Sequence, residues 1–208
     1  MRIKLSVTSC AALVLLSAGA ASASTVAMQF TGGSGDNIFQ NVMAGWRFTT
    51  NNQITIDNLG VYDPTGNGFV SAHQVGIWDS VGNLLGTATV PTGTGGTLVN
   101  GFRYTPLAPL TLPGGQLFTI AAFYGPQGDF IQTFNAVVTT DGSINYVDRA
   151  TSATAVFAFP LNFNTSNLAG DFGPDFTIAR GAAGTPEPAS FLLLGLGLVT
   201  VSAFRRKR

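Results

Sequence analysis

The stretch HQVGIWDSVGNLLGTATV, residues 73–90, carries the clearest fold signal in the chain. Residues 74–78 alternate between apolar and other side chains, and a second short segment, residues 84–90, follows a turn at residues 79–83. A period of two is that of a β-strand with one buried face, and Asp, Ser, Gly and Asn favour turns. The stretch therefore predicts two strands joined by a turn.

Similar short segments recur on both sides of this stretch. Turn signals separate them, notably PTGNG at residues 64–68 and PGG at residues 113–115, and no helical periodicity of ten or more residues interrupts the series. We therefore predict an all-β fold, a single antiparallel β-sandwich of jelly-roll-like type. The predicted strands are residues 45–49, 54–61, 74–78, 84–90, 102–105, 117–124, 155–161 and 176–179.

The composition of residues 24–180, the predicted domain, differs from that of the whole chain. The chain as a whole has a formal net charge of zero, but this segment has four arginines, nine aspartates and neither lysine nor glutamate, which leaves a net charge of −5. It also has no cysteine, so it can form neither a disulfide nor a cysteine metal site. An acidic, lysine-free domain lacks the basic surface that nucleic acid requires, and we predict no nucleic-acid partner.

The N-terminal segment, residues 1–23, has the three parts of a secretory signal peptide. A basic start is followed by an apolar run and then by small residues that end in Ala21-Ser22-Ala23. This pattern predicts recognition by the secretion machinery and cleavage by signal peptidase between Ala23 and Ser24. The alternative, a retained membrane anchor, would need a longer apolar run.

The C-terminal segment, residues 186–208, has three elements in a fixed order. Pro186, Glu187 and Pro188 come first, residues 189–204 carry no charge, and the chain closes on a basic cluster of Arg205, Arg206, Lys207 and Arg208. A helix of 16 residues would span about 24 Å, which makes a short transmembrane segment that the basic side chains can extend by reaching the headgroups. The basic cluster would stay in the cytoplasm and the preceding domain would lie outside, after a linker at residues 181–185. The alternative is a buried core helix, against which the uncharged run and its terminal basic cluster argue.

These three elements resemble the PEP-CTERM sorting signal of exported proteins in Gram-negative bacteria. The resemblance covers about the last 24 residues of the chain. It implies that an exosortase, a membrane-embedded processing enzyme, recognises the tail and removes it near Pro186-Glu187-Pro188. It also implies a transient anchor in the inner membrane, followed by transfer to the outer surface or extracellular matrix.

Part of the predicted domain resembles an uncharacterised β-sandwich family of exported bacterial proteins. The resemblance spans residues 45 to about 124 and rests on four segments, namely GWRFT at 45–49, LGVYD at 59–63, HQVGIWD at 73–79 and GFRY at 101–104. Members occur beside sorting tails and carbohydrate-related modules. The resemblance implies a surface or matrix role and a possible contact with exopolysaccharide, but no defined activity.

Two aspartates are candidate calcium ligands. Asp63 and Asp79 each end a predicted strand at a turn, where loops carry function, and calcium takes oxygen ligands. The simpler interpretation is that each carboxylate caps its own turn through hydrogen bonds to the backbone, and we favour it. We predict no cofactor and no metal, and retain Asp63 and Asp79 as the calcium alternative.

His73 and Arg103 are expected to line one end of the sandwich together with Asp63 and Asp79, and Trp78 is a separate candidate for a ligand contact. His73 is the chain's one histidine, and no Gly-x-Ser-x-Gly segment supplies a nucleophile for it, so a structural role is favoured. Trp78 falls out of phase with the apolar residues of its strand and is the candidate sugar contact, with burial between or beneath sheets as the alternative. Other aromatics weighed for a stacking platform, against a place in the core, are Trp46, Tyr62, Tyr104, Phe123 and Tyr124.

The sequence thus predicts an exported, exosortase-processed β-sandwich of the envelope or extracellular matrix. We expect a structural or adhesive component with no catalytic residues. The first alternative is a glycan- or calcium-binding module, and the second is a secreted hydrolase.

Overall fold

The structure, a computed structural model, describes residues 23–32, 36–127, 129–132, 136–164 and 172–181. Ala23–Gly181 form one compact unit. Within these described ranges no helix is long and apolar enough to cross a bilayer. The expected signal peptide, apart from Ala23, and the expected transmembrane helix at residues 189–204 lie outside the described residues.

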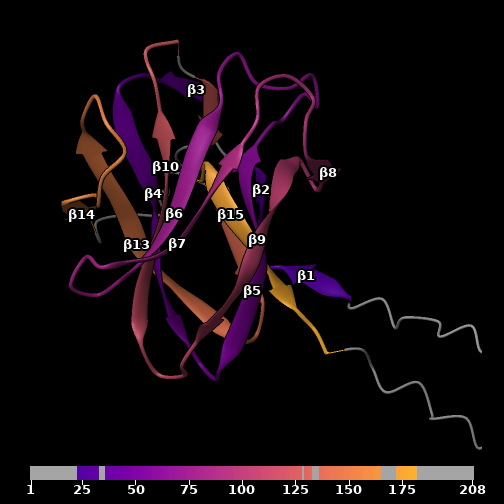
Figure 1. Ribbon diagram of the computed structural model, residues 1–208, viewed down its shortest axis with the longest axis vertical. Helices are drawn as coiled ribbons and strands as arrows, with labels where there is room; N and C mark the ends of the chain where they lie inside the picture. Colours follow the sequence, from indigo (N-terminus) through magenta and orange to yellow (C-terminus); the bar gives the residue numbers. More distant parts are fainter. Residues whose placement is uncertain (1–22, 33–35, 128, 133–135, 165–171, 182–208) are drawn as a thin grey trace, which may run out of the picture. The chain divides into compact units, whose positions relative to one another are not determined.

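Fifteen antiparallel strands, in two larger sheets and two short pairs, make up the described part of the chain (Figure 1). In spatial order, the five-stranded sheet is β1 (Ser24–Val26), β15 (Pro174–Ala179), β5 (Ile54–Tyr62), β9 (Phe102–Leu112) and β8 (Thr97–Val99). The six-stranded sheet is β14 (Asn162–Asn164), β13 (Ile144–Ala153), β4 (Val42–Thr50), β10 (Leu117–Tyr124), β6 (His73–Asp79) and β7 (Leu84–Val90). The pairs are β11 (Asp129–Gln132) with β3 (Asp36–Phe39), and β12 (Ala136–Thr140) with β2 (Met28–Gly32). The prediction of an all-β, antiparallel fold is confirmed.

The two larger sheets share one hydrophobic core, because alternate residues of their strands point toward each other. Trp46 of β4 stacks on Phe176 of β15, with ring centroids 5.8 Å apart and an interplanar angle of 17°. Both rings are completely buried, and the indole N–H of Trp46 donates a 2.8 Å hydrogen bond to the carbonyl oxygen of Pro174. The polar edge of the largest core side chain is therefore satisfied by the facing sheet, which fixes how the two sheets align.

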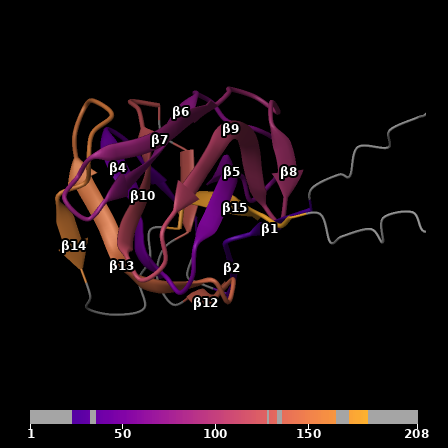
Figure 2. The same ribbon diagram turned by 60° about the horizontal axis from the view of Figure 1, so that its bottom comes forward.

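One side of the fold is closed by the curl of the sheets (Figure 2). Gly86 of β7, the edge strand of the six-stranded sheet, lies against Leu107 and Leu110 of β9. A Cβ atom at Gly86 would come within 3.1 Å of the Leu110 side chain, so glycine lets the strand approach closely.

One predicted strand is wrong. Residues 155–161 alternate like a strand, but in the structure they form an irregular segment between β13 and β14. Phe157 and Phe159 of this segment lie against Trp78, with ring centroids 5.2 and 6.1 Å apart. The alternation therefore reflects a loop that lays aromatic rings on the outer face of a sheet, and it does not reflect a ladder of backbone hydrogen bonds.

Candidate functional site

Asp63 and Arg103 form a buried ion pair at one end of the domain, where the loop of residues 64–68 leaves β5. The Asp63 Oδ2 atom accepts hydrogen bonds from Arg103 Nε at 2.5 Å and from the Gly68 amide at 3.0 Å. The remaining guanidinium nitrogens of Arg103 donate to the carbonyl oxygens of Gly66 at 2.6 Å and of Thr94 at 2.9 Å. The pair therefore holds two loops in place, as expected of charges that are buried with their hydrogen bonds satisfied.

His73 and Asp129 form a second buried pair. The imidazole Nε2 atom lies 2.8 Å from Asp129 Oδ2, and Nδ1 lies 3.0 Å from the carbonyl oxygen of Phe123. The ring is completely buried between Phe69 and Tyr124. Both ring nitrogens are engaged within the fold, so neither is available as a general base for a nucleophile in this conformation.

A small cavity of about 90 Å³ lies between these two pairs. Its lining includes the carboxylates of Asp63 and Asp129, and the Val70 amide donates a 3.3 Å hydrogen bond to Asp129 Oδ1. Among the described residues no group of three or more His, Cys, Asp or Glu side chains is placed to hold a metal ion. The loop of residues 64–70 is thus attached to the body of the domain by both carboxylates.

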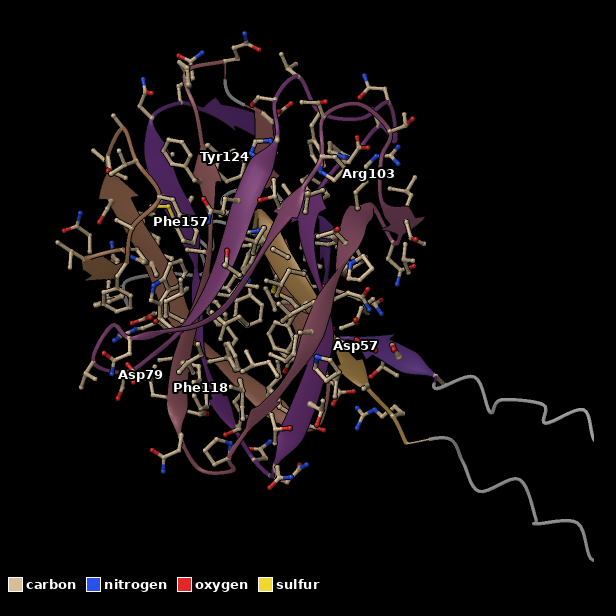
Figure 3. The ribbon with its side chains drawn as sticks, in the orientation of Figure 1. Asp57, Asp79, Arg103, Phe118, Tyr124 and Phe157 are labelled. Atoms are coloured by element: carbon tan, nitrogen blue, oxygen red, sulfur yellow. The ribbon has the colours of Figure 1, made fainter. Side chains whose placement is uncertain are left out.

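Asp79 lies at the opposite end of the domain from Arg103 (Figure 3). It begins the turn between β6 and β7, and its carboxylate accepts hydrogen bonds from the backbone amides of Val81 and Asn83 at 3.0 and 2.9 Å. The Asn83 side chain adds a third at 2.7 Å. These bonds, chiefly those from Asn83, lower the pKa of Asp79. The structure therefore brings His73, Asp63 and Arg103 to one end and leaves Asp79 apart from them.

Trp78 points away from the main core but is covered. Only 3% of its surface is exposed, because Phe157 and Phe159 lie over it. A Cβ atom at Gly76 would come within 2.7 Å of both the Trp78 and Phe157 rings, so glycine makes room for them. Of the other aromatics, Trp46, Tyr104 and Tyr124 are buried, while Tyr62 and Phe123 are half-buried. The indole face that we considered for sugar stacking is thus occupied by the chain's own phenyl rings.

Asp175 of β15 and Tyr104 of β9 meet across Gly60 of β5, with which both are in register. The Tyr104 hydroxyl donates a 2.6 Å hydrogen bond to Asp175 Oδ2, while Oδ1 accepts none from the described residues. Asp175 is completely buried, and burial raises its pKa to about 8 against the opposing effect of the Tyr104 hydrogen bond. Burial also raises the pKa of Tyr104 well above its usual value of 10. A carboxyl group of this kind is protonated at neutral pH.

A groove of about 470 Å³ lies on another part of the domain, between the β1–β2 segment, the turn after β8 and the end of β12. Most of its lining residues carry a hydroxyl or amide group and Asp141 contributes one carboxylate, while apolar atoms form the larger part of the lining surface. The lining residues are Ser24, Thr25, Val26, Gln29, Val99, Asn100, Thr139, Thr140 and Asp141. Hydroxyls and amides both donate and accept hydrogen bonds, which suits a polyhydroxylated ligand.

The two ends of the domain lie side by side at this groove. Ser24 of β1 is in register with Ala179 of β15, and the Arg180 amide donates a 2.7 Å hydrogen bond to the carbonyl oxygen of Ala23. The Arg180 guanidinium forms an ion pair with Asp141 and donates to Thr25 Oγ1 at 3.1 Å. The chain leaves the domain directly after this anchor, toward the segment that begins at Thr185.

Residues 185–208 are a PEP-CTERM protein-sorting motif. PEP-CTERM proteins are exported and sorted to the cell surface by exosortase. The expected sorting signal, with Pro186, Glu187, Pro188 and the basic cluster, coincides with this match. No curated protein and no solved structure matches the chain significantly. The chain thus joins an all-β domain to a C-terminal PEP-CTERM sorting motif, which implies processing by exosortase.

Sequence reasoning missed the groove of this PEP-CTERM protein. Most of its lining comes from β1, β2, β8, β12 and adjacent turns, none of which was among the predicted strands. These strands are short, and Thr, Gln and Asn supply much of the lining without alternating with apolar residues. Two local hints were the glycine pair at 95 and 96 and the Asn100-Gly101 pair, which mark turns around β8.

Proposed function

We propose that residues 24–180 form a jelly-roll-like β-sandwich that serves as a non-catalytic structural or adhesive component of the cell envelope or extracellular polysaccharide matrix. The signal peptide of residues 1–23 directs export, and the segment of residues 189–204 is a transient anchor in the inner membrane. Exosortase then releases the domain near Pro186-Glu187-Pro188. The ligand of the released domain is an exopolysaccharide.

The groove is the observation that supports this proposal. It is open to solvent, large enough for one or two sugar rings, and lined by side chains that can exchange hydrogen bonds with sugar hydroxyls. At the end of the domain that carries the loop of residues 64–70, Asp63 and Asp129 instead form buried ion pairs with Arg103 and His73. A groove that offers hydrogen bonds and a loop end that is internally satisfied favour an adhesive role over a hydrolytic one.

Binding to exopolysaccharide purified from the producing strain tests the proposal. The exported protein should co-sediment with the polysaccharide, and replacing Gln29 and Asn100 in the groove by alanine should weaken binding about tenfold or more, since each lost hydrogen bond is worth about 1 kcal/mol. Gln116→Ala, an exposed change in the turn between β9 and β10, is the matched control. Equal binding by the groove variant and the control would overturn the assignment of the groove.

The same preparation separates adhesion from hydrolysis. An adhesive protein leaves the length of the polysaccharide unchanged during prolonged incubation, which size-exclusion chromatography of the polymer measures. Progressive shortening that persists after repeated purification of the protein would replace the adhesive proposal with a hydrolytic one.

A further inference from the structure

The Asp57 carboxylate is aimed across two strands by a β-bulge in β5. The register of β5 shifts at Asp57 against both neighbours. Against β15, Asn58 pairs with Thr177 and Ile56 with Ile178, so Asp57 is the extra residue. Against β9 the extra residues, 107–109, lie on β9 itself. A bulge of this kind redirects a side chain. The Asp57 side chain extends past β15 to β1, and Figure 3 places it beside β1.

Neutral groups alone surround this carboxylate in the described part of the chain. Asp57 Oδ1 accepts hydrogen bonds from the Thr177 hydroxyl and, at 3.0 Å, from the Asn58 side-chain amide. Asp57 Oδ2 accepts a hydrogen bond from the Ser24 hydroxyl. The neighbouring cation, Arg180, is instead paired with Asp141. Within the described ranges no ion pair joins Asp57 to a cation.

Ser24 is also the residue that the proposed signal-peptide cleavage exposes. Hydrolysis of the Ala23–Ser24 bond gives Ala23 a carboxylate, which leaves with the signal peptide, and gives Ser24 an α-ammonium. The new ammonium is three covalent bonds from the Ser24 Oγ atom that already contacts Asp57. Cleavage therefore creates a positive charge next to Asp57, a carboxylate for which the described part of the chain supplies no cationic partner.

We propose that Asp57, held by Thr177 and Asn58, is a capture site for the α-ammonium of mature Ser24. The inference rests on the proposed export and cleavage. Cleavage removes the Ala23 carbonyl oxygen, to which the Arg180 amide donates in the uncut chain. The ion pair with Asp57 takes over the attachment of the first residue, so maturation keeps the three-residue strand β1 on the edge of the sheet.

The domain has no lysine, so the pKa of the Ser24 α-amino group can be measured without interference from other primary amines. The chain's two lysines, Lys4 and Lys207, lie in the signal peptide and in the basic tail. In the mature protein the Ser24 α-amino group is the one primary amine between residues 24 and 206. An amine-specific acylating reagent, applied across a pH series and read by mass spectrometry of the N-terminal peptide, therefore reports the pKa of that group alone.

We expect the exported wild-type protein to show an α-amino pKa above the ordinary range of about 7.7–8.0, because a nearby carboxylate favours the charged form. Denaturant should return the value to that range. Asp57→Asn should give the ordinary value in the folded protein as well. Asp79→Asn, which removes the same charge at the opposite end of the domain, should keep the raised value.

A second variant is needed as a control, because Asp57→Asn could change the α-amino pKa by disturbing the fold. Insertion of one alanine between Ala23 and Ser24 leaves every residue of the site in place but moves the ammonium one residue away, and its pKa should be ordinary. A wild-type protein that begins at Ser24 with an ordinary α-amino pKa would overturn the capture site. An N-terminus at any other residue would instead overturn the proposed cleavage position, and the capture site with it.

Discussion

The Tyr104 hydroxyl donates a 2.6 Å hydrogen bond to Asp175 across the glycine of an intervening strand. The phenol has its pKa raised well above 10, and the carboxyl has its pKa raised to about 8 by complete burial. A protonated carboxyl and a neutral phenol are therefore the forms that the folded protein keeps at neutral pH. Tyr104 lies on β9 and Asp175 on β15, on either side of β5. The protonation state of the pair therefore affects how stably these three strands are held together.

Asp175→Asn should flatten the pH dependence of thermal stability. An unfolded Asp side chain has a pKa of about 3.9, so between pH 4 and 8 the folded state binds more protons at this residue than the unfolded state does. Stability from this group is complete below pH 4 and is lost as the pH rises toward 8. The wild type should therefore lose Tm between pH 5 and 9, and Asp175→Asn should lose less.

The Asp79→Asn variant, at a half-buried position in the turn after β6, is the control for this measurement. It changes the net charge of the domain by the same amount without a buried carboxyl, and its Tm should follow the wild-type slope above pH 5. Parallel slopes for the wild type and Asp175→Asn would show that the protonation of Asp175 is not linked to folding.

Phe157→Ala should uncover Trp78. The Phe157 ring lies 5.2 Å from the indole and covers its face, so its removal should shift Trp emission to longer wavelength and increase quenching by acrylamide. The loss of buried contacts should lower the free energy of unfolding by about 1–3 kcal/mol. Val156→Ala, an exposed change in the same segment, should alter neither property, and equal quenching in both variants would contradict the packing.

Calcium should leave the Tm of the domain unchanged. Asp63 and Asp129 line a common cavity, but Asp63 Oδ2 already accepts hydrogen bonds from Arg103 and the Gly68 amide, and the two Asp129 oxygens accept from His73 and the Val70 amide. A ligand at free concentration L that binds the native state alone would stabilise it by RT ln(1 + L/Kd), so the Tm would rise as the calcium concentration rises above the Kd. Scanning calorimetry in calcium chloride and in chelator tests this, and a rise with calcium that Asp63→Asn abolishes would establish a calcium site.

Replacing Pro186, Glu187 and Pro188 by alanine should stop release of the domain. The sorting motif spans residues 185–208, and without its Pro-Glu-Pro element the uncut chain should keep its apolar segment. Immunoblots of cell fractions should then show the longer chain in the inner membrane. Release of this variant at the normal size would mean that processing does not depend on Pro-Glu-Pro.

The central strands could be predicted from sequence because they are short apolar segments bounded by turn signals. Residues 74–78 and 117–124 fall in β6 and β10, although most residues of both strands are buried on either face and their burial does not alternate. Residues 155–161 show that an alternating apolar pattern also arises when a loop packs Phe157 and Phe159 on a sheet. Periodicity reports burial, and burial does not require strand pairing.

Asp129, the partner of His73, had no local signal, whereas His73, Asp63 and Arg103 were candidates from the sequence. His73 and Asp129 are 56 residues apart, and Asp129 lies among polar residues that resemble an ordinary loop. Their proximity depends on the pairing of β10 with β6, which brings Phe123 to His73. The bulge at Asp57 was equally hidden, because one extra residue leaves the apolar pattern of β5 nearly intact.

The pairing of β1 with β15 brings both ends of the domain to one edge of the fold, where Ser24 faces Ala179. A domain with adjacent ends can be spliced into a surface loop of a host protein, or circularised through a short peptide, with little distortion of either partner. Ala23–Gly181 form one compact unit by themselves. The PEP-CTERM ectodomain is thus a self-contained module that can be carried on any tether that reaches this single edge.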